Sequence, residues 1–303
     1  MLSTALVMAA ALLLDRLLGE PTRLHPLAGF GRYAAWLERS LNRNGASRLT
    51  GSATWLLAIT PLLLLLGALW QLPALHPWID VAVLYFALGL RSLHEHAQAV
   101  AQALQHDDLP LARQRVGMIV SRDTSSMQSS DVARAGVESV LENGNDAVFG
   151  ALFWFVLLGA PGALLYRLAN TLDAMWGYRT SRYLHFGWAA ARLDDLLNFI
   201  PARLTAFSYA LFGNTRTALR CWKQQAQHWS SPNAGPVMAS GAGSLSVQLG
   251  GAAQYHGVTE ARPLLGAGGQ AAASDIVRAL ALVQRSAWLW VGCALLIGGG
   301  LHA

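Results

Sequence analysis

The sequence predicts an all-α, polytopic integral membrane protein with cytoplasmic helical segments and re-entrant or broken helices. Of the 303 residues, 53% are hydrophobic and only 13% are charged, whereas soluble domains carry about 25% charged residues. The mean hydropathy of +0.34 agrees with this class. Residues 49–79 contain no charged side chain, and this run exceeds the roughly 20 apolar residues that a spanning helix needs.

We expect a single integrated membrane domain over residues 1–303, because no spacer or repeat separates parts of the chain. Residues 91–146 are polar and periodic and predict a cytoplasmic helical insertion. Residues 224–275 are rich in Gly and Ser and predict a loop region. Glycine lets backbone N–H groups approach a ligand there, although turn chemistry alone explains the same composition.

Four segments read as membrane helices. Residues 1–20 lack the basic start of a secretory signal, so we interpret them as a retained membrane segment. Residues 52–70 and 78–90 predict two helices joined by the turn QLPALHP. Residues 286–301 predict a final span.

Two apolar segments are interrupted. Residues 147–166 are free of charge but contain Gly159 and Pro161, and charged residues flank both sides. Because irregular backbone at membrane depth is tolerated only under protein cover, a helical hairpin that enters and returns is favoured. Residues 199–212, with Pro201 inside and arginines on both sides, predict the same arrangement.

The arginines predict an orientation. Residues 16–48 carry six arginines and residues 91–134 carry five, whereas the turn at 71–77 carries no charge. The positive-inside rule places both basic segments in the cytoplasm and the turn and N-terminus outside. We therefore expect a multi-pass protein of the cell inner (plasma) membrane with a cytoplasmic active face.

Several function classes are excluded by inspection. No basic run resembles a nucleic-acid patch. Lys223 is the only lysine and lies in no GxxxxGK[ST] motif, so a P-loop is absent. GxSxG and HExxH are also absent. Cys221 and Cys293 are far apart in sequence, which disfavours a disulfide framework or a zinc site.

Three carboxylates recur along a helix predicted to begin near Asp131. Glu138, Glu142 and Asp146 are spaced i, i+4 and i+8 and would share one face, with Arg134 as a partner for Glu138. Such carboxylates repel one another unless a cation lies among them, and Mg²⁺ fits such a site. An acidic solvated face is the alternative.

The stretch ARLDDLLNFIPARL places charges among apolar residues. Asp194 and Asn198 are one turn apart, and so are Arg192 and Asp195. Charges near a membrane segment are unfavourable unless they are paired or functional. The pattern is equally compatible with an internal ion pair between Arg192 and Asp195 and with a functional role for these two residues. For Asp194, it favours a functional role. Pro201 frees backbone carbonyls within this helix.

Two weaker patterns add candidates. NTLDAMWGYR places Asn170 and Asp173 one turn apart, near Arg179. GEPTRLHP places Glu20 and Arg23 directly after the first predicted span. Neither pattern specifies a reaction by itself.

Taken in order, these motifs resemble the CbiB/CobD family of cobalamin biosynthesis, the adenosylcobinamide-phosphate synthases. The resemblance covers nearly the whole chain. The chain has Glu20 where the family more often has Asp, and Asp-Ala where it has Asp-Gly. The motifs that carry the resemblance are GEP…HP, SRDTSSM, ESVLENGNDAVFGALFW, GAPGALLYRLANTLDAMWGYR, YLHFGWAAARLDDLLNFIPARL, SPNAGPVMA and LGG…Y.G.

The resemblance implies an ATP-dependent amide ligase. It would join a propionate of adenosylcobyric acid to the amine of aminopropanol phosphate or a related amino-alcohol phosphate. A carboxylate is a poor acyl donor, so activation through an acyl phosphate is expected, with ATP and Mg²⁺ as cofactors and cationic side chains around the phosphoryl group. Membrane lipid and other cobalamin-assembly enzymes are the further expected partners, and nucleic acid is not.

The patterns and the resemblance together assign three kinds of site residue. The expected catalytic residues are Asp123, Glu138, Asp194 and Arg192. The expected substrate- or phosphate-binding residues are Arg122, Asn170, Asp173, Arg179, Arg203 and Asn233. The expected metal ligands are Glu142 and Asp146.

A polytopic transporter or sensor, with the same charges lining a polar passage, is the alternative function. Transporters often have paired halves with interrupted helices in matching positions. The chain shows interruptions around residues 159–162 and at 201 but no two-fold repeat.

Overall fold

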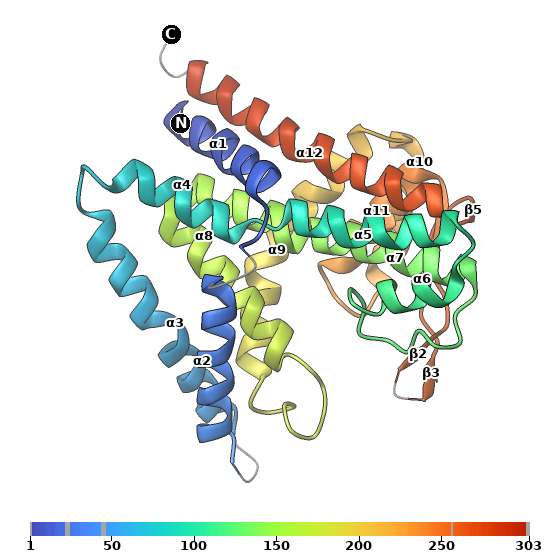
Figure 1. Cartoon of the computed structure of the whole chain (residues 1–303), viewed down its shortest axis with the longest axis horizontal. Helices are drawn as coiled ribbons and strands as arrows, with labels where there is room; N and C mark the ends of the chain where they lie inside the picture. The colour runs from blue at the N-terminus through green and yellow to red at the C-terminus, as the bar shows by residue number, and fades with distance from the viewer. Residues whose placement is uncertain (1, 22–24, 44–46, 256, 301–303) are drawn as a thin grey trace. The chain divides into compact units, whose positions relative to one another are not determined.

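The structure is a computed structural model that describes residues 2–21, 25–43, 47–255 and 257–300. It is mainly helical (Figure 1), as predicted. The chain forms two compact units that interleave in sequence. Unit 1 comprises Met1–Gly89, Asp146–Asn198 and Cys293–Ala303, and unit 2 comprises Leu90–Asn145 and Phe199–Gly292. A single integrated membrane domain stays a prediction.

Unit 1 contains α1 to α4, α8 and the first part of α9. Their bounds are α1 Leu2–Leu18, α2 Pro26–Leu41, α3 Arg48–Trp70, α4 His76–Ala87, α8 Gly150–Trp176 and α9 Trp188–Leu211. Large apolar side chains from α2, α3 and α8 form its core, including Phe30, Trp55, Ile59, Leu172 and Trp176.

Three described helical stretches are long and apolar enough to cross a membrane: Arg48–Trp70, Ser129–Trp176 and Ala273–Gly298. The first and last agree with the predicted spans at 52–70 and 286–301. The helix predicted at 78–90 is present as α4, but its 12 residues are fewer than the roughly 20 that a crossing needs.

The predicted interruption of α8 is present. Gly159 has φ +65° and ψ −153°, outside the helical region. The carboxylate of Asp80 accepts a hydrogen bond from the backbone N–H of Ala160 at 3.2 Å and another from Trp70 Nε1 at 2.9 Å. Asp80 therefore caps the second half of α8, and this fixes the break.

The hairpin predicted at 199–212 is wrong, because α9 is one continuous helix through Pro201. Proline lacks the N–H that would bond to the carbonyl of Leu197. That carbonyl accepts a hydrogen bond from Trp154 Nε1 at 2.9 Å instead. A side chain thus replaces the missing backbone donor, so the helix continues.

Unit 2 contains the predicted helical insertion at 91–146. It consists of α5 Leu90–Gln105, α6 Leu109–Val116 and α7 Ser129–Gly144. The unit also contains the second part of α9 and most of α12. Its remaining helices are α10 Thr215–Gln225, the short helix η2 Ala226–His228, α11 Ala234–Leu245 and α12 Ala273–Gly300.

The predicted loop region at 224–275 is largely ordered. Every residue of α11 is buried, so its small side chains serve close helix packing. Five short strands follow. β1 Val247–Gly250 pairs antiparallel with β4 Leu264–Gly266 and parallel with β5 Gly269–Gln270, and β2 Ala253–Tyr255 forms a hairpin with β3 Val258–Glu260. These strands were not anticipated by the all-α prediction.

The helix after α7 changes type. A π-helix, η1, runs over Asn145–Phe149, and its bonds span five residues instead of four. The single acidic face expected from Glu138 to Asp146 stays a prediction, because Asp146 lies at the start of this π-helix. Glu138 and Glu142 belong to α7 in unit 2, whereas Asp146 belongs to unit 1.

Candidate functional site

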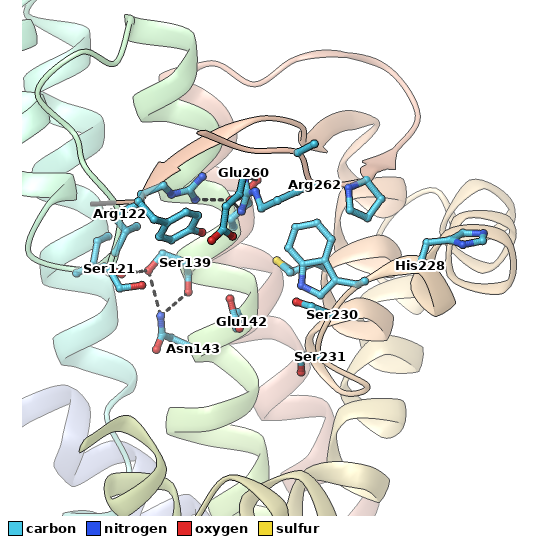
Figure 2. A pocket seen from close by; sticks show the side chains of 18 residues that line it. Ser121, Arg122, Ser139, Glu142, Asn143, His228, Ser230, Ser231, Glu260 and Arg262 are labelled. Carbon is cyan, nitrogen blue, oxygen red and sulfur yellow. Dashed lines mark hydrogen bonds and ion pairs between the residues drawn. The ribbon is translucent and has the colours of Figure 1, made fainter. Parts of the chain in front are cut away.

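A polar cavity of about 490 Å³ lies within unit 2. Side chains from α7, from the segment before it, and from the loops around η2 and β3 line it, as Figure 2 shows. Three predicted residues from two motifs meet here: Arg122 from SRDTSSM, and Glu138 and Glu142 from ESVLENGND. Candidate site residues that are separated in the sequence therefore line the same cavity.

Glu138 holds two arginines at this wall. It forms a buried ion pair with Arg122, and Arg262 donates to both of its oxygens at 3.2 and 3.3 Å. The N–H of Gly250 adds a bond of 2.7 Å. Breaking a buried ion pair from one side is strongly destabilising. This geometry fits an anchor that positions guanidinium groups, and the catalytic role assigned to Glu138 stays a prediction.

Arg134 does not pair with Glu138 as expected. Its guanidinium donates to Asp131, one turn earlier, at 2.8 Å.

Sequence reasoning missed Arg262. Besides the pair with Glu138, its Nε donates to the carbonyl of Gly251 at 3.0 Å, and its guanidinium lies 5.2 Å from the centre of the Trp229 ring. A cation over an aromatic face is attracted to the ring. The available signal was the position of Arg262, three residues after the charge-free stretch 224–259.

The carboxylate of Glu142 lines the same cavity, one turn along α7. Beside it, Asn143 Nδ2 donates to the carbonyl and the hydroxyl of Ser139 at 2.9 and 3.0 Å (Figure 2). The carboxylate of Glu260 and the side chain of His228 also line the cavity. The wall thus combines guanidinium groups with carboxylates.

Asp123 lies at a smaller hollow of about 220 Å³ that Arg122 also lines. Its Oδ1 accepts hydrogen bonds from the backbone N–H and hydroxyl of Ser125 at 2.9 and 2.7 Å. These bonds, the backbone one first, lower the pKa of Asp123. The carboxylate is exposed and is ionised at neutral pH.

Arg203 and Asn233, both predicted to bind substrate, bond to each other. Arg203 Nη1 donates to Asn233 Oδ1 at 3.0 Å, and Nη2 donates to the carbonyl of Pro232 at 3.2 Å. Ser231 Oγ accepts from the N–H of Ala234 at 3.1 Å and lines the cavity. The Arg203–Asn233 pair therefore braces the start of α11 next to the cavity wall.

Unit 1 holds a second group, which we call the acid–amide cluster: Asp194, Asn170, Asn198, Asp146 and Asp173. Asp194 Oδ1 accepts from Asn170 at 3.3 Å, and Oδ2 accepts from Asn198 at 3.1 Å. Both donors are neutral amides, so neither bond brings a positive charge to the carboxylate.

Burial raises the pKa of Asp194 well above its ordinary value, and the charges of Asp146 and Asp173 raise it further. The bonds from Asn170 and Asn198 lower it by less. Three carboxylates that repel one another in a partly dry site favour a proton or a bound cation. Four residues predicted from three motifs thus meet in one cluster.

The donors of this cluster fit Mg²⁺. Among the described residues, no three His, Cys, Asp or Glu side chains form a complete metal site. Magnesium is commonly bound by one or two carboxylates with substrate phosphates and water completing its shell. The assignment of Glu142 and Asp146 as metal ligands stays a prediction; Glu142 lines the cavity of unit 2, and Asp146 belongs to unit 1.

The predicted internal pair of Arg192 and Asp195 is wrong in its environment. Arg192 Nη1 lies 3.9 Å from Asp195 Oδ2, and the Arg192 side chain is 64% exposed. Burial raises the pKa of Asp195, whereas the charges of Arg192 and then Arg179 lower it. This is a surface pair. Glu20 is exposed, and Arg23 lies outside the described residues.

Comparison with known proteins adds a family assignment. The family model described as CobD/Cbib protein matches residues 8–283. The chain is 58% identical to "Cobalamin biosynthesis protein CobD" of Stutzerimonas stutzeri and 56% identical to the protein of that name from Chromobacterium violaceum, over the full length of each chain. A Mycobacterium tuberculosis protein of that name is 41% identical over 89% of this chain and 88% of its own. No solved structure matches.

Proposed function

The chain belongs to the CobD/Cbib family of cobalamin biosynthesis proteins, and from this premise we propose that it is an adenosylcobinamide-phosphate synthase. The reaction joins the propionate of adenosylcobyric acid to the amine of an amino-alcohol phosphate, such as aminopropanol phosphate, and forms an amide. The observation that best supports this proposal is the meeting of Arg122, Glu138 and Glu142 at one polar cavity.

The cavity suits an amino-alcohol phosphate. Such a molecule carries a phosphate at one end and an ammonium group at the other. The guanidinium groups of Arg122 and Arg262 are matched to phosphate oxygens, and the carboxylates of Glu142 and Glu260 are matched to the amine. Its volume of about 490 Å³ is within the usual range for small-molecule sites.

The acid–amide cluster suits Mg²⁺. Asp194 and Asp146 would hold the ion, and Asn170 and Asn198 orient the Asp194 carboxylate. ATP with Mg²⁺, when bound, supplies the free energy that makes the propionate a competent acyl donor. Asp194 has to lose its proton to bind the ion, so Mg²⁺ binding weakens as the pH falls.

The reaction is tested with protein purified in detergent. Adenosylcobyric acid, aminopropanol phosphate, ATP and Mg²⁺ are mixed with it, and the amide product is measured by mass spectrometry. We expect Glu142→Gln to lower kcat/KM for the amino-alcohol phosphate about 10- to 100-fold, since a charge-assisted bond contributes about 1.5–3 kcal/mol. Glu95→Gln is the matched control, because the Glu95 side chain is 58% exposed on α5.

If Glu142→Gln forms product at the wild-type rate, Glu142 does not take part in binding the amino-alcohol phosphate. If wild type forms no product with any amino-alcohol phosphate, the ligase proposal is wrong. The transporter alternative has less support, since α9 is continuous and the described chain shows no matching pair of broken helices. We propose the inner membrane as location, with the active face in the cytoplasm.

A further inference from the structure

Unit 1 contains an apolar cavity of about 460 Å³ that includes none of the predicted site residues. Parts of α2, α3, α4 and α8 form its walls, with side chains such as Phe30, Leu65, Val83 and Leu164. Two of these helices, α3 and α8, lie in stretches that are apolar and long enough to cross a membrane. A cavity with such walls favours a hydrocarbon ligand.

One charged side chain, Arg167, lines this cavity. Its Nε is buried without a hydrogen-bond partner. In the part of the chain that the structure describes, its guanidinium forms no hydrogen bond or ion pair. The other polar wall residue, Tyr33, is already bonded to the carbonyl of Leu57 at 3.2 Å. Among the described residues of the cavity wall, Arg167 is therefore the polar side chain whose buried donor lacks a partner.

The carboxylates near Arg167 act at a distance. Glu20 and Asp146 interact with it electrostatically. A side chain built at Gly89 would have its Cβ 3.5 Å from Glu20 Oε1 and 3.9 Å from Arg167 Nη2, so the backbone of Gly89 lies beside both groups. These charges lower the cost of burying the guanidinium, but its buried Nε–H has no hydrogen-bond partner among the described residues.

A single guanidinium beside an apolar cavity matches an amphiphile with an anionic head. Arginine binds phosphate oxygens through two parallel hydrogen bonds and is more weakly hydrated than lysine. Intramembrane charges usually pair with a counter-charge or mark a functional site. A lipid phosphate provides the counter-charge, and an acyl chain fills the apolar space.

We propose that this cavity is a binding site for an anionic phospholipid, whose phosphate pairs with Arg167 and whose acyl chain lies against α2, α3 and α8. The site is independent of the proposed ligase reaction. An enzyme inactive in amide formation can still bind the lipid, and a failure of lipid binding leaves the reaction proposal intact.

The test uses delipidated full-length protein in detergent. Phosphatidylglycerol and phosphatidylcholine with identical acyl chains are added at equal amounts, and bound lipid is counted by native mass spectrometry. We expect at least about tenfold preference for phosphatidylglycerol, since hydrogen bonds to a charged group contribute about 1.5–3 kcal/mol. Glycerol phosphate, which has the head chemistry without acyl chains, is the second probe and should not protect the protein from heat.

Three variants distinguish specific lipid binding in the cavity from general attraction of anionic lipid to surface charge. Arg167→Gln should lose the preference and remain folded, because it removes a buried charge. Arg39→Gln, a change of the same kind at an exposed position of α2, should keep it. Gly29→Leu should reduce binding of both lipids, since Gly29 lines the cavity and its added Cβ meets no atom closer than 3.9 Å.

Each contrary outcome overturns the proposal. Equal binding of the two lipids by wild type, or equal losses in Arg167→Gln and Arg39→Gln, would show general surface attraction. Protection by glycerol phosphate alone would show a soluble phosphate ligand in place of a lipid. Unchanged lipid binding by Gly29→Leu would place the lipid outside the cavity.

Discussion

Asp194 and Asp195 are adjacent carboxylates with different surroundings. Asp194 is held by two neutral amides among other carboxylates, whereas Asp195 lies 3.9 Å from an arginine that is 64% exposed. A helix turns about 100° per residue, so neighbours face different environments. The chemistry of this stretch therefore depends on which carboxylate is removed.

Asp194→Asn should abolish most activity and leave stability unchanged or improved. The amide keeps the volume and removes a charge that burial and two carboxylates disfavour. We expect amide formation to fall about 100-fold or more, as when a group stabilising the transition state is lost. Product formation and thermal unfolding in detergent measure the two effects. An unstable but active Asp194→Asn protein would contradict this assignment.

Asp195→Asn is the natural control. A surface ion pair contributes about 0–1 kcal/mol, so this variant should unfold within a few degrees of wild type. The larger loss of stability that follows when a buried ion pair is broken is not expected for this exposed pair. If Asp195→Asn is stable yet inactive, Asp195 and not Asp194 is the functional carboxylate.

The stability difference between wild type and Asp194→Asn should depend on pH. Because the pKa of Asp194 is raised in the folded state, the folded protein binds this proton more tightly. The resulting stabilisation is complete below the ordinary value of 3.8 and is lost as the pH rises through the folded-state value. Without divalent cations, the variant should therefore gain stability relative to wild type as the pH rises above the ordinary value of 3.8.

Magnesium adds a second readout to this titration. If Asp194 binds the ion, Mg²⁺ should raise the unfolding temperature of wild type more than that of Asp194→Asn, since a ligand stabilises only the state that binds it. Equal shifts at neutral pH would place the ion elsewhere.

At the scale of elements, α9 depends on one side chain from α8. Trp154 Nε1 donates to the carbonyl that Pro201 leaves without a backbone donor. Trp154→Phe should destabilise the protein by about 1–3 kcal/mol, the range for an unsatisfied buried polar group. In a Pro201→Ala background the backbone N–H returns, so the same change should have a smaller effect. A double-mutant cycle by denaturant unfolding measures this coupling. Additive effects would mean that the indole bond is incidental.

The break in α8 depends on Gly159. Its φ of +65° is rarely adopted by other residues, and an added Cβ would lie 3.0 Å from the Trp70 ring. Gly159→Ala should therefore destabilise the protein by about 1–2 kcal/mol. Gly67→Ala is a control in α3, because its Cβ would meet nothing within 4 Å. Equal unfolding temperatures for the two variants would show that the break tolerates a side chain.

At the scale of the whole molecule, the orientation across the membrane is open to test. The arginine excess predicts that residues 16–48 and 91–146 face the cytoplasm. Single cysteines at Gly45 and Gln105, in a chain without Cys221 and Cys293, should be shielded from an impermeant thiol reagent in intact cells. Gln105 is exposed at the end of α5, and Gly45 lies outside the described residues. Labelling of both cysteines in intact cells would show that these segments face outward, opposite to the predicted orientation.

The sequence alone determined the helical membrane class, the family resemblance and the break near Gly159. Hydropathy and charge are summed over many residues, so local packing does not obscure them. The motifs also gave Arg122, Glu142, Asn170 and Asp194 as candidate site residues, because charged and amide side chains are conspicuous in an apolar chain.

The tertiary structure decided which of these residues meet. A π-helix follows Gly144, and Trp154 donates to the carbonyl that Pro201 leaves without a backbone donor in α9. Arg262 reaches Glu138 from 124 positions away in the chain. Short-range periodicity contains no information about such contacts, because partners distant in sequence supply the donors and acceptors. Sequence therefore determined the chemical groups available to this protein, and packing decided which of them share a site.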